Sequence, residues 1–328
     1  MCSSLDMLRT LCSRNSIVPS SYILPHEQNL QRTGDEPKAQ GSFADVWQGS
    51  HRGRTVALKV FRDPNSGESN GYERKTKEDF YKEAVVWKRL RHSNITQFYG
   101  INTTAFPLCL VCEWMPHGTI AQYLFQEPQA YRLVLMIDIA EGMNYLHENK
   151  IVHGSLNSAN ILINDDCQAC LCDFGLATLS YAGKPNMSPQ DSDGSGPLRW
   201  EAPERIDPKR IGVEKPMLSF QSDVYSFAMV TWEVFTGRIP FHDIRSDIQV
   251  VSSIMRGVRP HRPRQATWFG LVDEVWDIME DSWHDDPDKR PQSHRILARL
   301  KDVVDWLDRS VLEPPQQWPL EVYQTRTS

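Results

Sequence analysis

The sequence predicts an α+β protein in two parts, with a small β-rich part followed by a larger, mostly helical part. Residues 36–115 are rich in short apolar runs with strand character. After residue 118 the apolar residues repeat with helical spacing instead. A chain of 328 residues with 40% hydrophobic residues can bury an ordinary core, so both parts are expected to fold. Strands grouped before helices indicate the α+β class.

The small part is predicted to contain strands and one helix. The expected strands cover residues 43–48, 54–61 and 108–112. A polar loop from Asp63 to Gly71 precedes the helix. One face of that helix carries apolar residues at helical spacing, namely Phe80, Ala84, Trp87 and Leu90. Glu83 lies near this face and is expected to point inward.

Two long helices are predicted in the large part. The first carries a wide apolar stripe, formed by Leu133, Met136, Ile137, Ala140 and Met143. The second is expected to begin with Ser222 or Asp223 as its N-cap and to stop at Gly237. Outside these parts, residues 1–32 are expected to form an N-terminal extension and residues 311–328 a proline-containing C-terminal tail.

Composition narrows the classes of partner. A formal net charge of −6 leaves no broad basic surface for nucleic acid or an anionic membrane. No stretch approaches the ~20 apolar residues that span a bilayer, and the N-terminus lacks a secretory signal. Seven cysteines scattered along the chain suit reduced thiols better than a disulfide framework. We therefore expect a cytoplasmic protein that acts on a protein partner or protein substrate, with no nucleic acid and no membrane.

A Cys-x-x-Cys pattern occurs at Cys167 and Cys170, with Cys172 close by. Such a pair is half of a zinc site. No second pair of cysteines or histidines follows it at a suitable spacing. The pattern therefore favours buried cysteines on a short hairpin.

Several short motifs follow one another in a fixed order. They are the strand residues 56–59 (Val-Ala-Leu-Lys), the helix residue Glu83, residues 173–175 (Asp-Phe-Gly) and residues 202–204 (Ala-Pro-Glu). A lone lysine on a strand, or a lone glutamate on a helix, is usually an ordinary surface charge. Together and in this order the motifs resemble a protein kinase over roughly residues 36–310. Softer marks, beginning at His117, Leu198 and Ser222, resemble the tyrosine-kinase-like branch.

The resemblance implies the bilobal protein-kinase fold, with an N-lobe at residues 33–115 and a C-lobe at residues 116–310. It also implies a site for ATP and Mg²⁺. Lys59, held by an ion pair with Glu83, would contact the phosphates. Asn160 and Asp173 would hold Mg²⁺ through oxygen atoms. The remaining residues implied to bind the nucleotide are Ala39, Gly41, Val46, Ala57, the gatekeeper Cys112, the hinge residues Glu113 and Met115, and Leu162.

The resemblance also implies structural supports for this site. Asp223 would brace the catalytic loop, and Glu204 and Arg290 would form a buried ion pair. An apolar column linking the lobes would contain Trp87, Phe98, His153 and Phe174.

The most telling departure from the kinase pattern lies in the catalytic loop, residues 153–163, where Ser155 stands at the position of the catalytic aspartate. A hydroxyl cannot hold a proton near neutral pH as a carboxylate does. A general base contributes typically ~10²–10⁴-fold, which corresponds to about 3–5 kcal/mol of barrier. Asn157 stands where a lysine would stabilise the transferred phosphoryl group.

Two further departures are milder. The glycine-rich loop at residues 39–46 keeps one of three glycines, which should weaken nucleotide binding because alanine lacks the backbone freedom of glycine. Gly154 replaces the arginine that would pair with a phosphorylated activation loop.

Three functions stay open on these grounds. The first is a pseudokinase that keeps an ATP and Mg²⁺ site and signals through nucleotide-dependent protein interaction. The second is a weakly active kinase that transfers phosphate from ATP to serine, threonine or tyrosine of a protein. The third is an interaction scaffold that no longer binds nucleotide.

Overall fold

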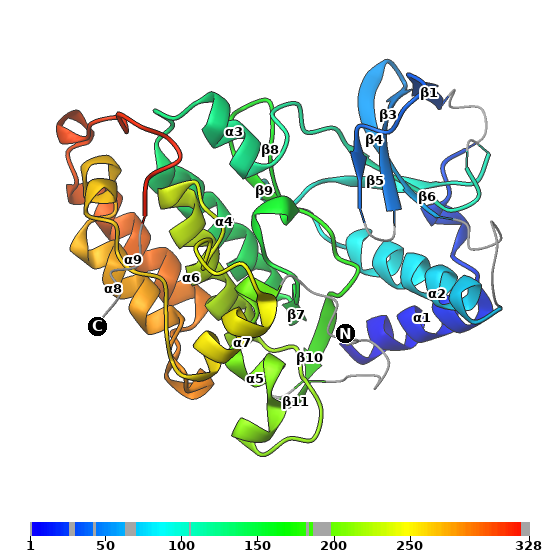
Figure 1. Cartoon of the computed structure of the whole chain (residues 1–328). Coiled ribbons are helices and arrows are strands. Elements are labelled where there is room, and N and C mark those ends of the chain that lie inside the picture. The colour runs from blue at the N-terminus through cyan, green and yellow to red at the C-terminus, as the bar shows by residue number, and fades with distance from the viewer. Residues whose placement is uncertain are drawn as a thin grey trace. The chain divides into compact units, whose positions relative to one another are not determined.

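The computed structural model describes residues 2–25, 30–41, 44–62, 70–104, 106–181, 184–185 and 198–322. The chain divides into two compact units, whose elements are labelled in Figure 1. The first unit comprises Met1–Pro116 and Cys172–Ala177, and the second comprises His117–Leu171 and Thr178–Ser328. A β-sheet organises the first unit and helices dominate the second, which confirms the predicted α+β class.

Within the described residues, the first unit is built on a six-stranded antiparallel sheet with the order β1-β3-β4-β6-β5, in which β2 also pairs with β3. The strands are β1 (Gln31–Thr33), β2 (Ala39–Gln40), β3 (Ala44–His51), β4 (Arg54–Phe61), β5 (Phe98–Asn102) and β6 (Cys109–Glu113). Strand β4 matches the predicted strand residue for residue. Val56 and Leu58 from β4 pack with Cys109 and Val111 from β6 in a fully buried cluster.

Two longer helices complete the first unit, α1 (Cys2–Asn15) and α2 (Asn70–Trp87). The predicted apolar face of α2 is buried, and Phe80 packs edge-on against Phe61 of β4 with ring centroids 5.3 Å apart. Within residues 1–32, the expected extension, α1 packs against α2 and β1 begins at Gln31. The N-terminal segment therefore belongs to the first unit.

The second unit is mostly helical. Its helices are α3 (Ile120–Gln126), α4 (Arg132–Glu148), α5 (Pro203–Ile206), α6 (Phe220–Thr236), α7 (Asp247–Met255), α8 (Asp273–Ser282) and α9 (Ser293–Trp306). Its short strands are β7 (Ile151–Val152), β8 (Ile161–Ile163), β9 (Ala169–Leu171), β10 (Thr178–Tyr181) and β11 (Lys184–Pro185). None of the helices in the described part of the chain is long and apolar enough to cross a membrane.

Helix α6 begins earlier than the sequence predicted. Its N-cap is Ser219, whose side chain accepts a hydrogen bond from the Ser222 amide at 3.0 Å. The Ser219 amide in turn donates to Ser222 Oγ at 3.0 Å, which completes a capping box. Ser222 and Asp223 were therefore wrong as N-caps, because they already lie in the first helical turn. The predicted stop at Gly237 is confirmed, with a left-handed φ of 68°.

The described residues of the expected C-terminal tail pack on the second unit. The Leu320 amide donates to the carbonyl of Thr236, at the end of α6, over 2.9 Å. A Cβ added to Gly237 would lie 2.8 Å from atoms of both Trp318 and Pro319, so the close approach requires glycine here. Trp318 also covers the buried guanidinium of Arg132 at 4.3 Å. Residues 318–322 thus add to the core of the second unit.

The cysteine pattern lies on the predicted hairpin, between β8 and β9. Cys170 is buried on β9, as expected. Cys167 is exposed, because it occupies the turn with a left-handed φ of 59°. The expectation that these cysteines are buried was therefore wrong for Cys167, and Cys172 is only partly buried.

Candidate functional site

Lys59, Glu83 and Asp173 meet in the first unit. The Lys59 ammonium lies 2.8 Å from Glu83 Oε1 and 2.8 Å from Asp173 Oδ1. Alternation along β4 places Lys59 on the same face as Ala57, and the inward face of α2 brings Glu83 to it. Glu83 is 1% exposed, whereas the Asp173 side chain is 44% exposed. One cation therefore joins a buried carboxylate to an accessible one.

The electrostatics of this triad keep Lys59 charged. Burial lowers the pKa of the Lys59 ammonium, but the carboxylates of Asp173 and Glu83 more than offset burial, so the pKa is raised above its usual value. Burial raises the pKa of Glu83 to about 7, against the attraction of the Lys59 charge. A lysine held in this way offers a fixed positive charge to an anionic ligand.

The backbone around Asp173 is held in an unusual conformation. Asp173 has a left-handed φ of 64°, which is uncommon for a residue with a side chain, and such strained residues are enriched at functional sites. The next residue, Phe174, is fully buried, and its ring lies 5.6 Å from that of Trp87. Burial of Phe174 fixes the segment and leaves the Asp173 carboxylate pointing to Lys59.

The residues predicted to surround adenine in the first unit lie on adjoining strands. Val46 on β3 pairs with Lys59, and Ala57 on β4 pairs with Cys112 on β6. Cys112 is buried, and burial raises the pKa of its thiol. In the described chain, the peptide N–H and carbonyl of Met115 hydrogen-bond to no other protein group. A backbone donor and acceptor left unpaired beside these side chains fit the edge of a planar heterocycle.

Part of the predicted glycine-rich loop is described. Ala39 on β2 pairs with Val46, and the Gly41 amide donates to the carbonyl of Ala44 over 2.9 Å. Ser42 and Phe43 lie outside the described residues. The base of the loop is therefore a regular hairpin on the sheet.

The catalytic loop belongs to the second unit, and Asp223 braces it as predicted. Asp223 Oδ2 accepts a hydrogen bond from the His153 amide, and Oδ1 accepts one from the Gly154 amide; the donor–acceptor distance is 2.8 Å in each. His147 Nε2 lies 2.9 Å from Asp223 Oδ2. Asp223 is buried in the first turn of α6, so the long helix fixes the start of the loop.

Ser155 and Asn157 are engaged in holding the loop together. Asn157 caps the 3₁₀ turn Ser158–Asn160, because its Oδ1 accepts from the Ala159 amide over 2.9 Å. Its Nδ2 donates to the Ser155 carbonyl over 2.9 Å. Ser155 Oγ accepts from Asn160 Nδ2 over 3.1 Å. The amide of Asn157 is thus used within the loop itself, and residues 153–160 contain no lysine or arginine.

Asn160 keeps one oxygen available. Its Nδ2 donates to the Ser155 carbonyl, at a distance of 2.8 Å, and also to the Ser155 hydroxyl. These two bonds fix the orientation of the Asn160 amide. In the described residues no group donates to Asn160 Oδ1. An oriented amide oxygen is a ligand that Mg²⁺ accepts, so Asn160 fits the role that the sequence suggested.

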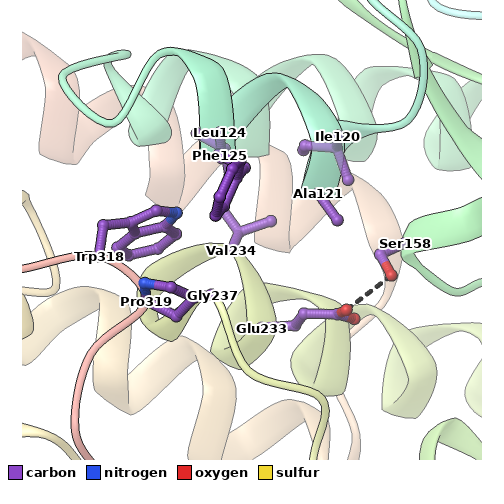
Figure 2. A pocket seen from close by; sticks show the side chains of 10 residues that line it. All are labelled: Ile120, Ala121, Leu124, Phe125, Ser158, Glu233, Val234, Gly237, Trp318 and Pro319. Atoms are coloured by element: carbon purple, nitrogen blue, oxygen red, sulfur yellow. Dashed lines mark hydrogen bonds between the residues drawn. The ribbon is translucent and has the colours of Figure 1, made fainter.

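A buried carboxylate that the sequence reasoning missed lies near this loop. Glu233 on α6 accepts from Ser158 Oγ over 2.7 Å and from Trp200 Nε1 over 3.0 Å. Figure 2 shows Glu233 and Ser158 at one end of a small cavity, with Trp318 and Phe125 further along it. Burial raises the pKa of Glu233 to about 7, although both hydrogen bonds lower it. A lone glutamate within the apolar run of α6 was the signal that could have indicated it.

Two predicted supports are present within their units. Arg290 forms a buried, two-pronged ion pair with Glu204 at 2.6 and 2.7 Å. The ring of Trp87 stacks on that of Phe98, with centroids 5.4 Å apart. His153 lies in the second unit, where it is also buried.

The predicted site residues therefore form two groups. The first unit holds Ala39, Gly41, Val46, Ala57, Lys59, Glu83, Cys112, Glu113, Met115 and Asp173, and the second holds Ser155, Asn157, Asn160 and Leu162. The groups differ in character, since the first is centred on charges and the second on neutral hydrogen bonds.

Comparison with known proteins agrees with this arrangement. The family model described as protein tyrosine and serine/threonine kinase matches residues 35–300. The serine/threonine-protein kinase STY46 of Arabidopsis thaliana is 30% identical over 270 residues, which cover 81% of this chain and 43% of the relative. The tyrosine-protein kinase TXK of Homo sapiens is 30% identical over 271 residues, covering 81% of this chain and 47% of the relative. The chain thus spans less than half the length of these curated relatives.

The matched region covers parts of both units and includes every predicted site residue. It begins just before β2 and ends within helix α9. The chain therefore belongs to the protein tyrosine and serine/threonine kinase family.

Proposed function

We propose that the chain is a pseudokinase that binds ATP with Mg²⁺ and signals through nucleotide-dependent contacts with a protein partner. It would belong to the tyrosine-kinase-like branch and act in the cytoplasm, with lobes at residues 33–115 and 116–310. The observation that carries this proposal is the catalytic loop, in which Asn157 is a structural cap and Ser155 an acceptor for Asn160.

The binding half of the proposal rests mostly on residues of the first unit, together with Asn160 of the second. Lys59 stays charged between Glu83 and Asp173, and would hold the phosphates. Asp173 and Asn160 would supply oxygens to Mg²⁺, and the unpaired Met115 peptide would hold the adenine edge. When bound, ATP would supply the phosphate groups and Mg²⁺ the positive charge that offsets their negative charge. The shortage of glycine at residues 39–46 makes this binding weaker, not impossible.

The loss of transfer rests on the second unit. Ser155 cannot accept and hold a proton near neutral pH, and Asn157 brings no charge toward a transferred phosphoryl group. Typical kinases turn over at about 1–100 s⁻¹. Removal of the base alone is worth ~10²–10⁴-fold, so removal of the lysine charge as well leaves little transfer.

A second candidate is a weak protein kinase acting on serine, threonine or tyrosine. It is favoured by the assembled ion pair of Lys59 and Glu83 at 2.8 Å and by relatives named as protein kinases. Phosphoryl transfer depends mainly on positioning and electrostatics, so the triad alone supports slow turnover.

Thermal unfolding with increasing ATP, with and without Mg²⁺, tests the binding half. A ligand at 100 times its Kd adds about 2.7 kcal/mol of stability, and the shift should shrink when EDTA removes the metal. Absence of any shift at millimolar ATP would exclude both nucleotide-dependent candidates and leave the interaction scaffold.

Incorporation of radiolabelled phosphate tests the transfer half. The wild-type chain is compared with Ser155→Asp combined with Asn157→Lys, and with Lys59→Met as the inactive control. The proposal expects incorporation only in the double variant. Incorporation by the wild type at ordinary kinase rates would contradict the proposal, and slow incorporation that Lys59→Met abolishes would favour the weak kinase.

A further inference from the structure

Helix α1 buries one side against α2. The buried side chains recur with helical spacing at Leu5, Arg9, Cys12 and Ser13. On the opposite side Met7 is 64% exposed and Leu11 is 52% exposed. In Figure 1 the blue helix α1 runs beside the cyan helix α2 of the same unit, in agreement with the contacts between them.

The segment after α1 is anchored to the sheet. The Leu24 amide donates to the Ile101 carbonyl of β5 over 2.8 Å, and Ile23 forms a parallel bridge with Ile101. A Cβ on Gly100 would lie 2.8 Å from the Leu24 side chain, so the chain packs closely on this edge strand. The buried ring of Tyr22 lies 5.9 Å from the ammonium of Lys88, just beyond the end of α2. Residues 20–25 therefore fix the position of α1.

Helix α2 is covered on two faces. Its Phe80 and Ala84 face the sheet, whereas Tyr81 lies on the adjoining face. Burial raises the pKa of Tyr81, Lys77 lowers it and the Cys12 thiol of α1 raises it, and α1 packs against α2. Glu83 is two residues beyond Tyr81 on the same rigid helix. A shift of this helix therefore carries Glu83 with it.

We propose that residues 2–25 act as a strut that positions α2 so that Glu83 reaches Lys59. Leu5 and Cys12 are its positioning residues. Release of α1 would separate Glu83 from Lys59 and weaken the nucleotide site, so this inference rests on the proposed function. Couplings between sites typically change affinity 5–150-fold, and we expect about a tenfold loss of ATP affinity on release.

A matched pair of variants tests the strut, because Leu5 is 7% exposed and Met7 is 64% exposed on the same helix. Leu5→Asp should release α1, whereas Met7→Asp adds the same charge to the outer face. Hydrogen exchange in the α2 amides without nucleotide should become faster in Leu5→Asp alone. ATP affinity should fall about tenfold in Leu5→Asp and stay unchanged in Met7→Asp.

A double-mutant cycle separates positioning from general destabilisation. In a Glu83→Gln background, Leu5→Asp should weaken ATP binding no further, because the lost contact is the same one. Additive losses in that cycle would overturn the proposal. The proposal would also be overturned if the Leu5→Asp chain folds and its α2 amides exchange at the same rate as those of Met7→Asp.

The two proposals fail in different ways. If the wild type binds no ATP, the proposed function fails while the exchange of α2 still decides whether α1 supports that helix. If Leu5→Asp does not fold, Leu5→Ala gives the same comparison with a smaller change.

Discussion

Glu83 in the first unit and Glu233 in the second are both buried, but they are held by different partners. Glu83 is paired with the ammonium of Lys59 at 2.8 Å. Glu233 receives neutral donors, the hydroxyl of Ser158 at 2.7 Å and the indole of Trp200 at 3.0 Å. The first arrangement preserves a charge that a ligand can use. The second ties the catalytic loop to its surroundings without offering any charge.

The same contrast separates the functional halves of the molecule. Around Lys59 the charged groups of a kinase persist in their expected geometry. In the loop from His153 to Asn160 the polar side chains hydrogen-bond within the loop or to α6, and only neutral groups take part on the loop side. Within the described chain, Asn160 Oδ1 is the oxygen that stays available. On the proposed function, nucleotide binding and phosphoryl transfer therefore depend on different groups of residues, and each can be tested by its own substitutions.

The largest expected effect comes from Lys59→Met. Removal of one partner of a buried ion pair typically costs about 3–5 kcal/mol, and the stabilisation by ATP should vanish as well. Thermal unfolding with and without ATP and Mg²⁺ measures both losses. Lys301→Met is the control, since Lys301 pairs with Glu141 at 2.6 Å and its side chain is 50% exposed. The control should lose less than about 1 kcal/mol and keep its ATP shift; equal effects in both variants would remove the special role of Lys59.

The stability of the chain should depend on pH through Glu233, whose hydrogen-bond partners are neutral. Its pKa rises from 4.5 to about 7 on folding, so the folded chain holds a proton that the unfolded chain releases between these values. Its contribution to stability is complete below pH 4.5 and is lost as the pH rises through about 7. The full contribution to the free energy of unfolding is about 3 kcal/mol, at about 1.36 kcal/mol for each unit of pKa shift.

Glu233→Gln removes this titration. The free energy of unfolding of the wild type minus that of the variant should therefore fall as the pH increases from about 5 to 8. Urea unfolding at several pH values measures the difference, in which other titrating groups cancel. A difference that stays constant with pH would show that Glu233 does not titrate in this range.

The smallest expected effect concerns the loop itself. Asn157→Ala removes the cap on the Ala159 amide and a donor to the Ser155 carbonyl, and loss of a cap typically costs about 1 kcal/mol. Ser155→Ala removes only the 3.1 Å contact with Asn160 Nδ2, so it should stay within about 0.5 kcal/mol. Urea unfolding of both variants compares them. Equal stabilities would mean that Asn157 is not a structural cap.

Much of the first unit could be predicted from local patterns. The strand that ends in Lys59 and the inward position of Glu83 follow from alternation and helical spacing, which depend on near neighbours in the sequence. The family motifs then placed Asp173 with them. The fold class followed from the same periodicities, because strands precede helices along the chain.

Other features depend on contacts between distant segments. The buried stripe of α1 includes Arg9 and Ser13, so its apolar spacing is weak and its packing on α2 could not be read from the sequence. Packing of Trp318 depends on Gly237, which lies far away in the chain. The cap at Ser219 was missed because Ser222 is an equally good capping residue, and only the backbone geometry separates them.

The cap formed by Asn157 has a consequence for reversibility. A lysine at this position has no oxygen to accept from the Ala159 amide, so restoring the charge sacrifices the hydrogen bond that orders the turn. An aspartate at position 155 restores the base without that charge. Neither single change supplies both the aspartate and the lysine of the kinase pattern. The change at position 157 also makes the chain less stable. If the chain is a pseudokinase, as we propose, recovery of phosphoryl transfer would need both changes, and one of them removes a hydrogen bond that stabilises the loop.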